Sequence, residues 1–296
     1  MAPALLFRVG MNTTARRPIA EDTHGSEDSL CINLIRRSLA TRDVGFEIHL
    51  YGAVSSTNDV ACGLAEHGAR EGTVVLAETQ RAGRRRFGRP WFSPDHANLY
   101  ASVIFRPAIA PSALPVFAMI ASLALADAVT GEGVPATVRW PNDVIVDGRR
   151  VGGTLTTAAT AGDVVKHAVL GVGVNLNVTR DALDSALGPD GALATSVSEV
   201  AGRTIDRNRF AASLLNRIER WHALYTSFGP AAVLAAWNQR DALCGRVVET
   251  TGPEGARHGR VIGVDGRGRL VLESRPGETQ LVACGDVTTI DGEPVR

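Results

Sequence analysis

The residues with the most specific chemical potential lie in residues 78–91, Glu-Thr-Gln-Arg-Ala-Gly-Arg-Arg-Arg-Phe-Gly-Arg-Pro-Trp. Five arginines fall within the nine residues 81–89, together with Gly83 and Gly88. Guanidiniums this dense cannot be buried without anions, because an unpaired buried charge is too costly. Their planar donors suit phosphate and carboxylate, and the glycines let backbone approach a ligand closely. The segment predicts an anion-binding loop; a solvated basic loop or a nucleic-acid patch is the alternative.

Three further motifs place polar groups or glycines at element boundaries. Residues 55–58, Ser-Ser-Thr-Asn, put hydroxyls and an amide at a strand-to-helix junction, although an ordinary helix N-cap has the same composition. Residues 139–143, Arg-Trp-Pro-Asn-Asp, must bend at Pro141, since proline is excluded from a central strand. The alternative there is a tight turn with Trp140 in the core. Residues 171–177, Gly-Val-Gly-Val-Asn-Leu-Asn, contain glycines inside an apolar strand, which indicates close approach of a ligand or of other backbone.

The composition makes the arginine cluster a local feature of a neutral molecule. The chain has 296 residues, 31 basic and 31 acidic, and Lys166 is its only lysine. Neutral charge argues against a general nucleic-acid binder. The four cysteines form no C-x-x-C pair, which disfavours a metal knuckle and suits a reducing cytoplasm. The longest apolar run, 117–129, is too short to span a bilayer and contains Asp127, so it predicts a buried helix and no membrane attachment.

Periodicity and turn residues predict an irregular mixture of helices and strands, which favours α+β with a mixed or antiparallel sheet. Residues 1–27 are polar and aperiodic and predict disorder. The expected helices cover residues 29–40, 113–130 and 206–228, with one beginning after Ser56 and a short one reaching 237. The expected strands are 46–51, 73–77, 99–105, 137–140, 144–146, 151–157 and 164–176. From residue 245, short glycine-punctuated strands at 246–250, 260–264, 270–273 and 280–283 predict a small barrel.

Taken together and in this order, the motifs resemble the biotin–protein ligases, over roughly residues 29–290. The matching segments are Ser56-Thr-Asn58, residues 80–91, residues 139–143 and Gly171-Val-Gly-Val-Asn175, followed by the small barrel. The resemblance implies a catalytic domain similar to class II aminoacyl-tRNA synthetases, over residues 28–243, and an SH3-like barrel over 244–296. It also implies ATP-dependent formation of biotinyl-5′-AMP and transfer of biotin to a lysine of a biotin carboxyl carrier domain.

The resemblance carries site roles onto individual residues. Catalytic roles fall on Arg84, Arg86, Asp143 and Arg150. The biotin-binding residues would be Ser56, Thr57, Asn58, Gln80, Gly83, Arg84, Arg85, Arg86, Arg150, Gly152 and Gly153. ATP or adenylate would contact Arg86, Arg89, Trp91, Asn142 and Asn175. Cations would offset the repulsion between the biotin carboxylate and the α-phosphate, and Mg²⁺ would be held by phosphate oxygens rather than by the protein.

The sequence departs from the family pattern at several of these positions. Arg85 replaces a glycine, Phe87 replaces a position that is commonly basic or polar, and Arg139 and Arg150 each replace a lysine. Drift from lysine to arginine and loss of function are competing explanations, since arginine keeps the charge but is bulkier and forked. A non-catalytic binder of biotin or carrier and a lipoate ligase or octanoyl transferase remain the alternative functions.

The resemblance also bears on partners and assembly. Some family members carry an amino-terminal winged helix, and the 44 residues before Gly45 are too few for one, so we expect no sequence-specific DNA binding. The partner would be the carrier domain of a biotin-dependent carboxylase. The sequence does not determine the oligomeric state, and a homodimer is left open. Whether the barrel contacts ligands or only braces the main domain is also left open.

Overall fold

The computed structural model describes residues 29–294, so the disorder predicted for residues 1–27 lies outside the described part of the chain. Seven strands form one mixed sheet in the order β1-β2-β3-β7-β6-β5-β4. β1 and β2 are parallel, and all other neighbouring pairs are antiparallel. The strands are β1 (Ile48–Val54), β2 (Val74–Gln80), β3 (Leu99–Phe105), β4 (Thr137–Arg139), β5 (Asp143–Val146), β6 (Arg149–Ala161) and β7 (Val164–Val174).

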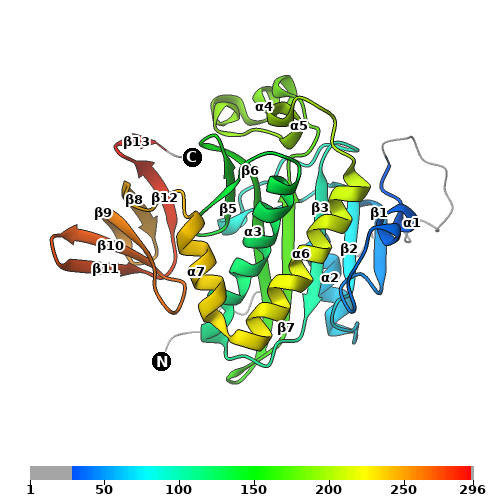
Figure 1. Ribbon diagram of the computed structural model, residues 1–296, viewed down its shortest axis with the longest axis horizontal. Helices are drawn as coiled ribbons and strands as arrows, with labels where there is room; N and C mark the ends of the chain where they lie inside the picture. The colour runs from blue at the N-terminus through cyan, green and yellow to red at the C-terminus, as the bar shows by residue number, and fades with distance from the viewer. Residues whose placement is uncertain (1–28, 295–296) are drawn as a thin grey trace.

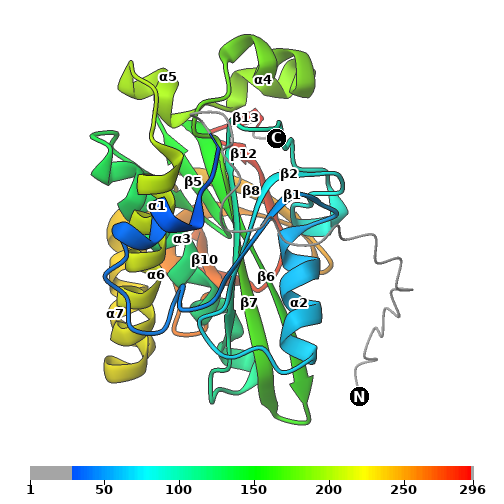
Figure 2. The same ribbon diagram turned by 90° about the vertical axis from the view of Figure 1, so that its right-hand side faces the viewer.

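Helices cover both faces of this sheet (Figures 1 and 2). One face carries α3 (Leu114–Gly131), α6 (Arg207–Phe228) and α7 (Pro230–Arg240), and the other carries α2 (Thr57–Glu66). The short helix α1 (Ile32–Arg37) packs on α6. Because both faces are covered, β3 is buried along its whole length, and its seven residues, Leu-Tyr-Ala-Ser-Val-Ile-Phe, include one hydroxyl that reappears in the site below.

The long apolar helix α3 is a core helix. By length and composition alone, Pro111–Gly131 could cross a membrane, with a mean hydropathy of 1.8, but 67% of this stretch is buried inside the protein. Phe117 on α3 packs edge-on against Phe105 of β3 and Tyr225 of α6, with ring centroids 5.7 and 5.5 Å apart. The apolar surface of α3 is therefore used to join the sheet to α6.

A second, six-stranded antiparallel sheet follows α7, and we call it the C-terminal sheet. Its order is β11-β10-β9-β8-β12-β13, built from β8 (Val247–Gly252), β9 (Gly255–Val264), β10 (Leu270–Arg275), β11 (Glu278–Val282), β12 (Asp286–Ile290) and β13 (Glu293–Pro294). The Trp140 indole N–H donates to Gly268 O (3.1 Å), so the C-terminal sheet is fastened to the bend after β4. The predicted boundary between residues 243 and 244 falls in the segment between α7 and β8.

The predicted α+β class, with a mostly antiparallel sheet and a small all-β unit at the end, is confirmed. β6 and β9 extend beyond their predicted bounds, and β12 and β13 are not among the predicted strands. Three other details differ. The strand predicted over residues 46–51 is wrong at its start, because Gly45 turns the chain at a positive φ and leaves Phe46 two-thirds exposed under the guanidinium of Arg70. The helix predicted over residues 29–40 is shorter, at Ile32–Arg37. The third is a helical region that the sequence analysis missed altogether: α4 (Arg180–Leu187), a 3₁₀ turn (Gly188–Leu193) and α5 (Val197–Ala201).

Candidate active site

One cleft collects most of the predicted site residues. Counted with its open mouth it encloses about 860 Å³, and it lies among the β1–α2 junction, the carboxyl ends of β2 and β7, the first residues of β5 and β12, and residues 153–155 of β6. Six arginines and two aspartates supply its charged groups. The residues that line it are Ser56, Thr57, Asn58, Gln80, Arg84, Arg85, Arg86, Arg89, Trp91, Arg139, Trp140, Pro141, Asn142, Asp143, Arg150, Gly153, Thr154, Leu155, Gly171, Val172, Gly173, Asp286 and Val287.

A buried network of hydroxyls and amides forms one side of the cleft. Gln80 Oε1 accepts from the Thr57 N–H (2.9 Å). Ser102 Oγ, on β3, lies 2.8 Å from Thr57 Oγ1 and 2.6 Å from Asn58 Oδ1. Asn58 Nδ2 donates to Leu155 O on β6 (2.9 Å). We call Thr57, Asn58, Gln80 and Ser102 the amide–hydroxyl network, and its fixed orientation suits a small polar ligand group that needs both donors and acceptors.

Ser56 holds the N-cap position of α2 in extended backbone, but its side chain makes no capping hydrogen bond within the described chain. Gln80 satisfies the first amide of the helix instead. The Ser56 hydroxyl, only 5% exposed as a residue, therefore remains available to the cleft it lines. Ser56 thus occupies the N-cap position, as the alternative interpretation of the motif expects, but its side chain does not cap the helix.

The glycines of β7 allow close approach, but the groups that approach Gly171 and Gly173 are side chains, whereas the prediction named a ligand or other backbone. A Cβ added to Gly171 would lie 2.0 Å from Asn58 Oδ1, and one added to Gly173 would lie 2.8 Å from Trp91 Nε1. The strand thus makes room for the amide of Asn58 and for the indole of Trp91. The buried Trp91 Nε1 has no hydrogen-bond partner among the described residues, so its donor is free to meet a ligand.

The arginine loop, residues 81–89, folds back on itself beside the cleft. Arg85 N–H donates to Arg89 O (2.7 Å), and Trp91 N–H donates to Gly83 O (2.9 Å). Arg84 pairs with Asp59 on α2, whereas Arg86 and Arg89 reach the C-terminal sheet. The loop is therefore tethered from both sides, and the guanidiniums of Arg84, Arg85, Arg86 and Arg89 border the cleft as an anion site requires.

Arg85, which stands where the family pattern has glycine, points part of its guanidinium into this cationic cleft. Its Nε donates to Pro90 O (3.2 Å). Burial lowers the pKa of Arg85, and the nearby charges of Arg150 and Arg89 lower it further. The direction of this shift means that Arg85 lies in a positive field, which a bound anion would relieve.

Asp143 lines the cleft and forms ion pairs with two arginines that also line it. Its Oδ2 accepts from Arg139 Nη2 (2.7 Å) and from Arg150 Nη2 (2.9 Å). Burial by itself would raise the pKa of Asp143, but the charges and hydrogen bonds of Arg150 and Arg139 outweigh it and hold the pKa below its usual range. Asp143 is therefore an ionised counter-ion at neutral pH and a weak proton acceptor. Its geometry fits a role in orienting Arg139 and Arg150 better than general-base chemistry.

Three predicted site residues do not line the cleft. Gly83 packs between Gln80 and Ser93, so its space is filled by the loop itself. Gly152 packs inward against Leu125 and the backbone of Gly173. Asn175 is buried and donates to Thr195 O (3.0 Å), which ties β7 to the segment before α5. Direct ligand contacts for these three stay predictions, and the contacts named here are to protein groups.

Sequence reasoning also missed residues that the fold brings into the site. Ser102 lies inside an apolar strand that also contains the hydroxyl of Tyr100, so nothing in the sequence marked Ser102 as a site residue. Asp286 and Val287 come from the C-terminal sheet, about 200 positions from the arginine loop. Arg139 was noted only as replacing a lysine of the family pattern, and its ion pair with Asp143 makes it one of the charged residues that line the cleft.

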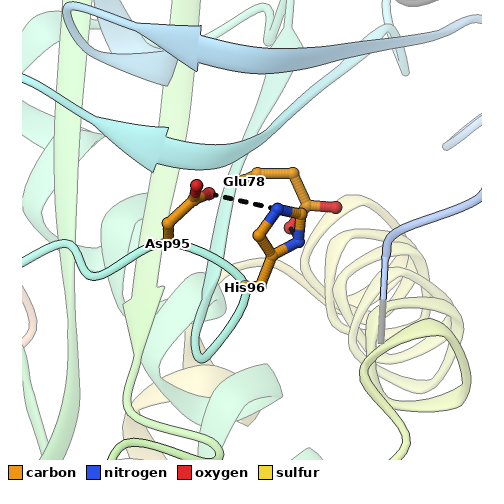
Figure 3. Close-up of side chains that lie close together, drawn as sticks. All are labelled: Glu78, Asp95 and His96. Carbon is orange, nitrogen blue, oxygen red and sulfur yellow. Dashed lines mark ion pairs between the residues drawn. The ribbon is translucent and has the colours of Figure 1, made fainter. Parts of the chain in front are cut away.

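A separate cluster of possible metal ligands lies outside the cleft. His96 lies beside the carboxylates of Glu78 and Asp95, at 3.4 and 3.6 Å (Figure 3). The Glu78 carboxylate is buried and already has Arg207 Nη2 at 2.7 Å and the Leu30 N–H at 2.6 Å. Arginine therefore supplies the compensating positive charge, and the group has the properties of a structural ion pair that fastens β2 to α6.

Comparison with known proteins places this chain and its fold in one class. The model of the biotin/lipoate A/B protein ligase family matches residues 51–175. The biotin–[acetyl-CoA-carboxylase] ligase of Paracoccus denitrificans is 32% identical over 235 residues, covering 78% of this chain and 96% of the relative. The corresponding ligase of Mycobacterium tuberculosis is 32% identical over 275 residues, covering 88% and 97%.

Two further comparisons agree. The bifunctional ligase/repressor BirA of Bacillus spizizenii is 30% identical over 244 residues, covering 82% of this chain and 74% of the relative. The biotin protein ligase of Aquifex aeolicus, solved in complex with biotin and ATP, has the same fold, with a TM-score of 0.68 at 22% identity, covering 82% of this chain and 97% of that one. The chain belongs to the biotin–protein ligases of the biotin/lipoate A/B protein ligase family.

Proposed function

We propose that this protein is an ATP-dependent biotin–protein ligase that activates biotin as biotinyl-5′-AMP and then transfers it to a lysine of a biotin carboxyl carrier domain. The observation that carries the proposal is the convergence of the amide–hydroxyl network and six arginines in one cleft. The relatives from P. denitrificans and M. tuberculosis carry the name of this activity, with acetyl-CoA carboxylase as the protein acted on.

The amide–hydroxyl network would hold the ureido ring of biotin. That ring offers two N–H donors and one carbonyl acceptor, which need fixed partners once water is excluded. Ser56 and the network supply hydroxyl and amide groups that can fill both roles. The acyl chain would then run towards Arg150 and the arginine loop, so that the carboxylate lies among cations.

In the first step, a carboxylate oxygen of biotin attacks the α-phosphorus of ATP. A new oxygen–phosphorus bond forms, the α–β phosphoanhydride bond breaks, and pyrophosphate leaves with the bonding electron pair. Both reactants are anions, so the arginines of the cleft must offset their repulsion and the charge that develops on the leaving group. Arg86, Arg89 and Arg150 all line the cleft, which supports this role for them.

In the second step, the neutral amine of the carrier lysine attacks the acyl carbon of biotinyl-5′-AMP. The carbon–nitrogen bond forms, the bond from the acyl carbon to the AMP oxygen breaks, and the amine loses its proton to solvent. Because its pKa is lowered, the Asp143 carboxylate is a weak acceptor for that proton, and its ion pairs support a role in holding Arg139 and Arg150 in place.

The cleft does not fit a Mg²⁺ ion held by protein groups. Its two carboxylates, Asp143 and Asp286, are each engaged by two arginines. We therefore propose that Mg²⁺ accompanies ATP through phosphate oxygens and water, and no step above depends on a protein-bound ion.

Biotin-dependent exchange of labelled pyrophosphate into ATP tests the proposal. A ligase gives exchange with biotin, whereas a lipoate-type enzyme gives exchange with lipoate or octanoate in its place. A non-catalytic binder takes up biotin by calorimetry and gives no exchange with either acid. That last result, obtained with folded protein, would overturn the proposed function.

Partner, location and assembly are proposals of the same kind. We propose a carrier domain of a biotin-dependent carboxylase as the acceptor, a cytoplasmic location and no sequence-specific DNA binding. Labelled biotin with a purified carrier domain tests the first, and a mobility shift at physiological salt tests the last. A homodimer stays open to measurement by sedimentation.

A further inference from the structure

The arginine loop and the C-terminal sheet meet at a single carboxylate. Arg86 Nη1 donates to Gly285 O (2.8 Å) and lies 3.5 Å from Asp286 Oδ1. Arg89 Nη2 pairs with Asp286 Oδ2 on the other side. Asp286 begins β12, and Asp286 and Val287 also line the cleft.

We propose that Asp286 is a positioning residue that holds Arg86 and Arg89 over the cleft for ATP binding, so that the C-terminal sheet supplies part of the active site. This inference rests on the proposed ligase function. The C-terminal sheet then does more than brace the main sheet, because the carboxylate of Asp286 holds two arginines that line the cleft.

The contacts of Arg86 and Arg89 with the C-terminal sheet leave donors free, so Asp286 can position these arginines without blocking anion binding. A guanidinium carries five N–H donors, and the ion pair with Asp286 uses one nitrogen of each, Nη1 of Arg86 and Nη2 of Arg89. Arg86 uses Nη1 for Gly285 O and Nη2 for the Cys284 thiol, and within the described chain its Nε is left over. Arg89 makes its one side-chain hydrogen bond, among residues 29–294, through Nη2. Both arginines can thus contact Asp286 and an anion in the cleft at the same time.

The loop has few other means of staying in place. Its tip residue Phe87 is 57% exposed and has a positive φ of 56°, which side chains other than glycine adopt at a cost. Elsewhere the loop is held by the Arg81 and Ala82 amides, which donate to Val54 O and Ser55 O (both 2.9 Å), and by the ion pair of Arg84 with Asp59 on α2. Removing the charge of Asp286 would break both ion pairs at the Arg86–Arg89 end, leaving there the hydrogen bonds of Arg86 to Gly285 and Cys284, while the other end stays attached.

A loop that is closed for a smaller fraction of time binds ATP more weakly by that same fraction. The Asp286 side chain is 25% exposed, so its two ion pairs are partly screened, and their loss is expected to be modest. We expect Asp286→Asn to raise the KM for ATP about three- to tenfold in biotin-dependent exchange, from the values typical of such pairs. The KM for biotin is expected to change less than about twofold, because the amide–hydroxyl network is untouched.

The experiment compares wild type, Asp286→Asn, Asp286→Glu and the control Asp291→Asn. Asp291 lies in the same sheet and pairs with Arg246, so the control removes a carboxylate and an ion pair away from the cleft. Steady-state exchange gives the two KM values and kcat, and thermal unfolding reports the stability of each variant. Asp286→Glu is expected to recover most of the ATP affinity, which a purely structural role in β12 would not require.

Limited trypsin digestion measures the loop directly and needs no activity. Mass spectrometry of the fragments is expected to show faster cleavage after Arg84, Arg85 and Arg86 in Asp286→Asn than in wild type or Asp291→Asn, whereas the Arg89–Pro90 bond is resistant to trypsin. The inference is overturned if Asp286→Asn leaves the ATP KM and loop cleavage unchanged, or lowers the KM, since a competing anion would do that. It is also overturned if Asp291→Asn raises the KM equally. Absence of exchange in wild type would instead refute the proposed function, and the digestion would still decide the loop contact.

Discussion

Asp143→Asn is the substitution that most directly probes the charged residues that line the cleft. The side chains of Arg139 and Arg150 are 8% and 16% exposed, and both donate to the same carboxylate oxygen. Replacing the carboxylate by an amide leaves two largely buried guanidiniums without a counter-ion. The amide oxygen can still accept a hydrogen bond from one of them, so the loss is of charge rather than of shape.

Breaking a buried ion pair by removing one partner costs about 3–5 kcal/mol, and the remaining amide contact places this case near 3 kcal/mol. On the scaling for domains of 150–250 residues, that corresponds to a fall in Tm of about 6–12 °C. The expected loss exceeds the roughly 1 kcal/mol typical of an exposed pair, so unfolding measurements can separate the two cases.

The pH dependence of the stability difference tests whether loss of the Asp143 charge is the cause of the destabilisation. Burial alone would raise the pKa of Asp143, but Arg150 and Arg139 hold it below its usual range. A depressed pKa gives stability that is present above the unfolded value and lost as pH falls through the folded one. The difference between wild type and Asp143→Asn should therefore be constant from pH 5 to 8 and shrink below about pH 4.

Urea unfolding of both proteins across this pH range is the assay. Asp147→Asn is the matched control, since Asp147 lies in the exposed β5–β6 turn at a positive φ of 48°, which asparagine tolerates well. The reasoning is refuted if Asp143→Asn is as stable as the control at pH 7, or if its deficit grows on acidification.

Three other predictions follow from the site and the connection to the C-terminal sheet. Arg150→Lys should retain or raise adenylate formation, because it restores the family's residue, whereas Arg86→Ala should lower it at least about 100-fold, as expected for loss of a charge-stabilising group. Gly171→Ala should weaken biotin binding and cost about 1–3 kcal/mol of stability, since its Cβ would lie 2.0 Å from the Asn58 amide. Burial raises the pKa of Asp241 to about 6. The free energy of unfolding should therefore fall by at most about 3 kcal/mol as pH rises from 4 towards 6, because the folded protein resists ionising this carboxyl. Asp241→Asn should abolish that fall in urea unfolding.

Matched measurements decide each of the three. Adenylate is quantified by chromatography of the quenched reaction, and equal activity of Arg86→Ala and wild type would contradict the site assignment. Gly266→Ala serves as the control for the glycine substitution, because a Cβ there meets nothing within 4 Å. An Asp241→Asn protein whose stability still falls between pH 4 and 6 would show that another group titrates there.

The sequence was most informative where local chemistry and burial agree. The strand Leu99–Phe105 is predicted to the residue, because seven apolar or small residues in a row can only be a strand covered on both faces or part of a helix, and flanking polar segments limit its length. The helix after Ser56 begins where its hydroxyl and amide residues predict. The turn Asp147-Gly148 joins β5 to β6 with both residues at positive φ.

The helices at residues 180–201 were missed because their apolar residues are few and their stability comes from contacts made at a distance. Capping signals were nevertheless present, since Thr179 Oγ1 accepts from Ala182 N–H and Ser196 Oγ accepts from Glu199 N–H. Glu199 is further held by Arg149 and Arg180, two arginines from different elements. Such long-range pairing leaves no periodic trace in the sequence.

In the site, motif residues were predictable and their partners were not. Ser56, Asn58 and Gln80 line the cleft as predicted, because their motif lies at one strand-to-helix junction and one strand end. Ser102 and Asp286 reach the same cleft only through sheet order and through the packing of the C-terminal sheet. Neither relation can be read from spacing along the chain.

Formation of the acyl-adenylate in a single turnover tests the central claim most directly. Wild-type protein is mixed with biotin and ATP labelled at the α-phosphate, and the quenched products are separated. The account predicts biotinyl-5′-AMP and pyrophosphate in equal amounts, dependent on biotin, with almost none from Arg86→Ala. Folded wild-type protein that binds biotin but yields no labelled acyl-adenylate would contradict it.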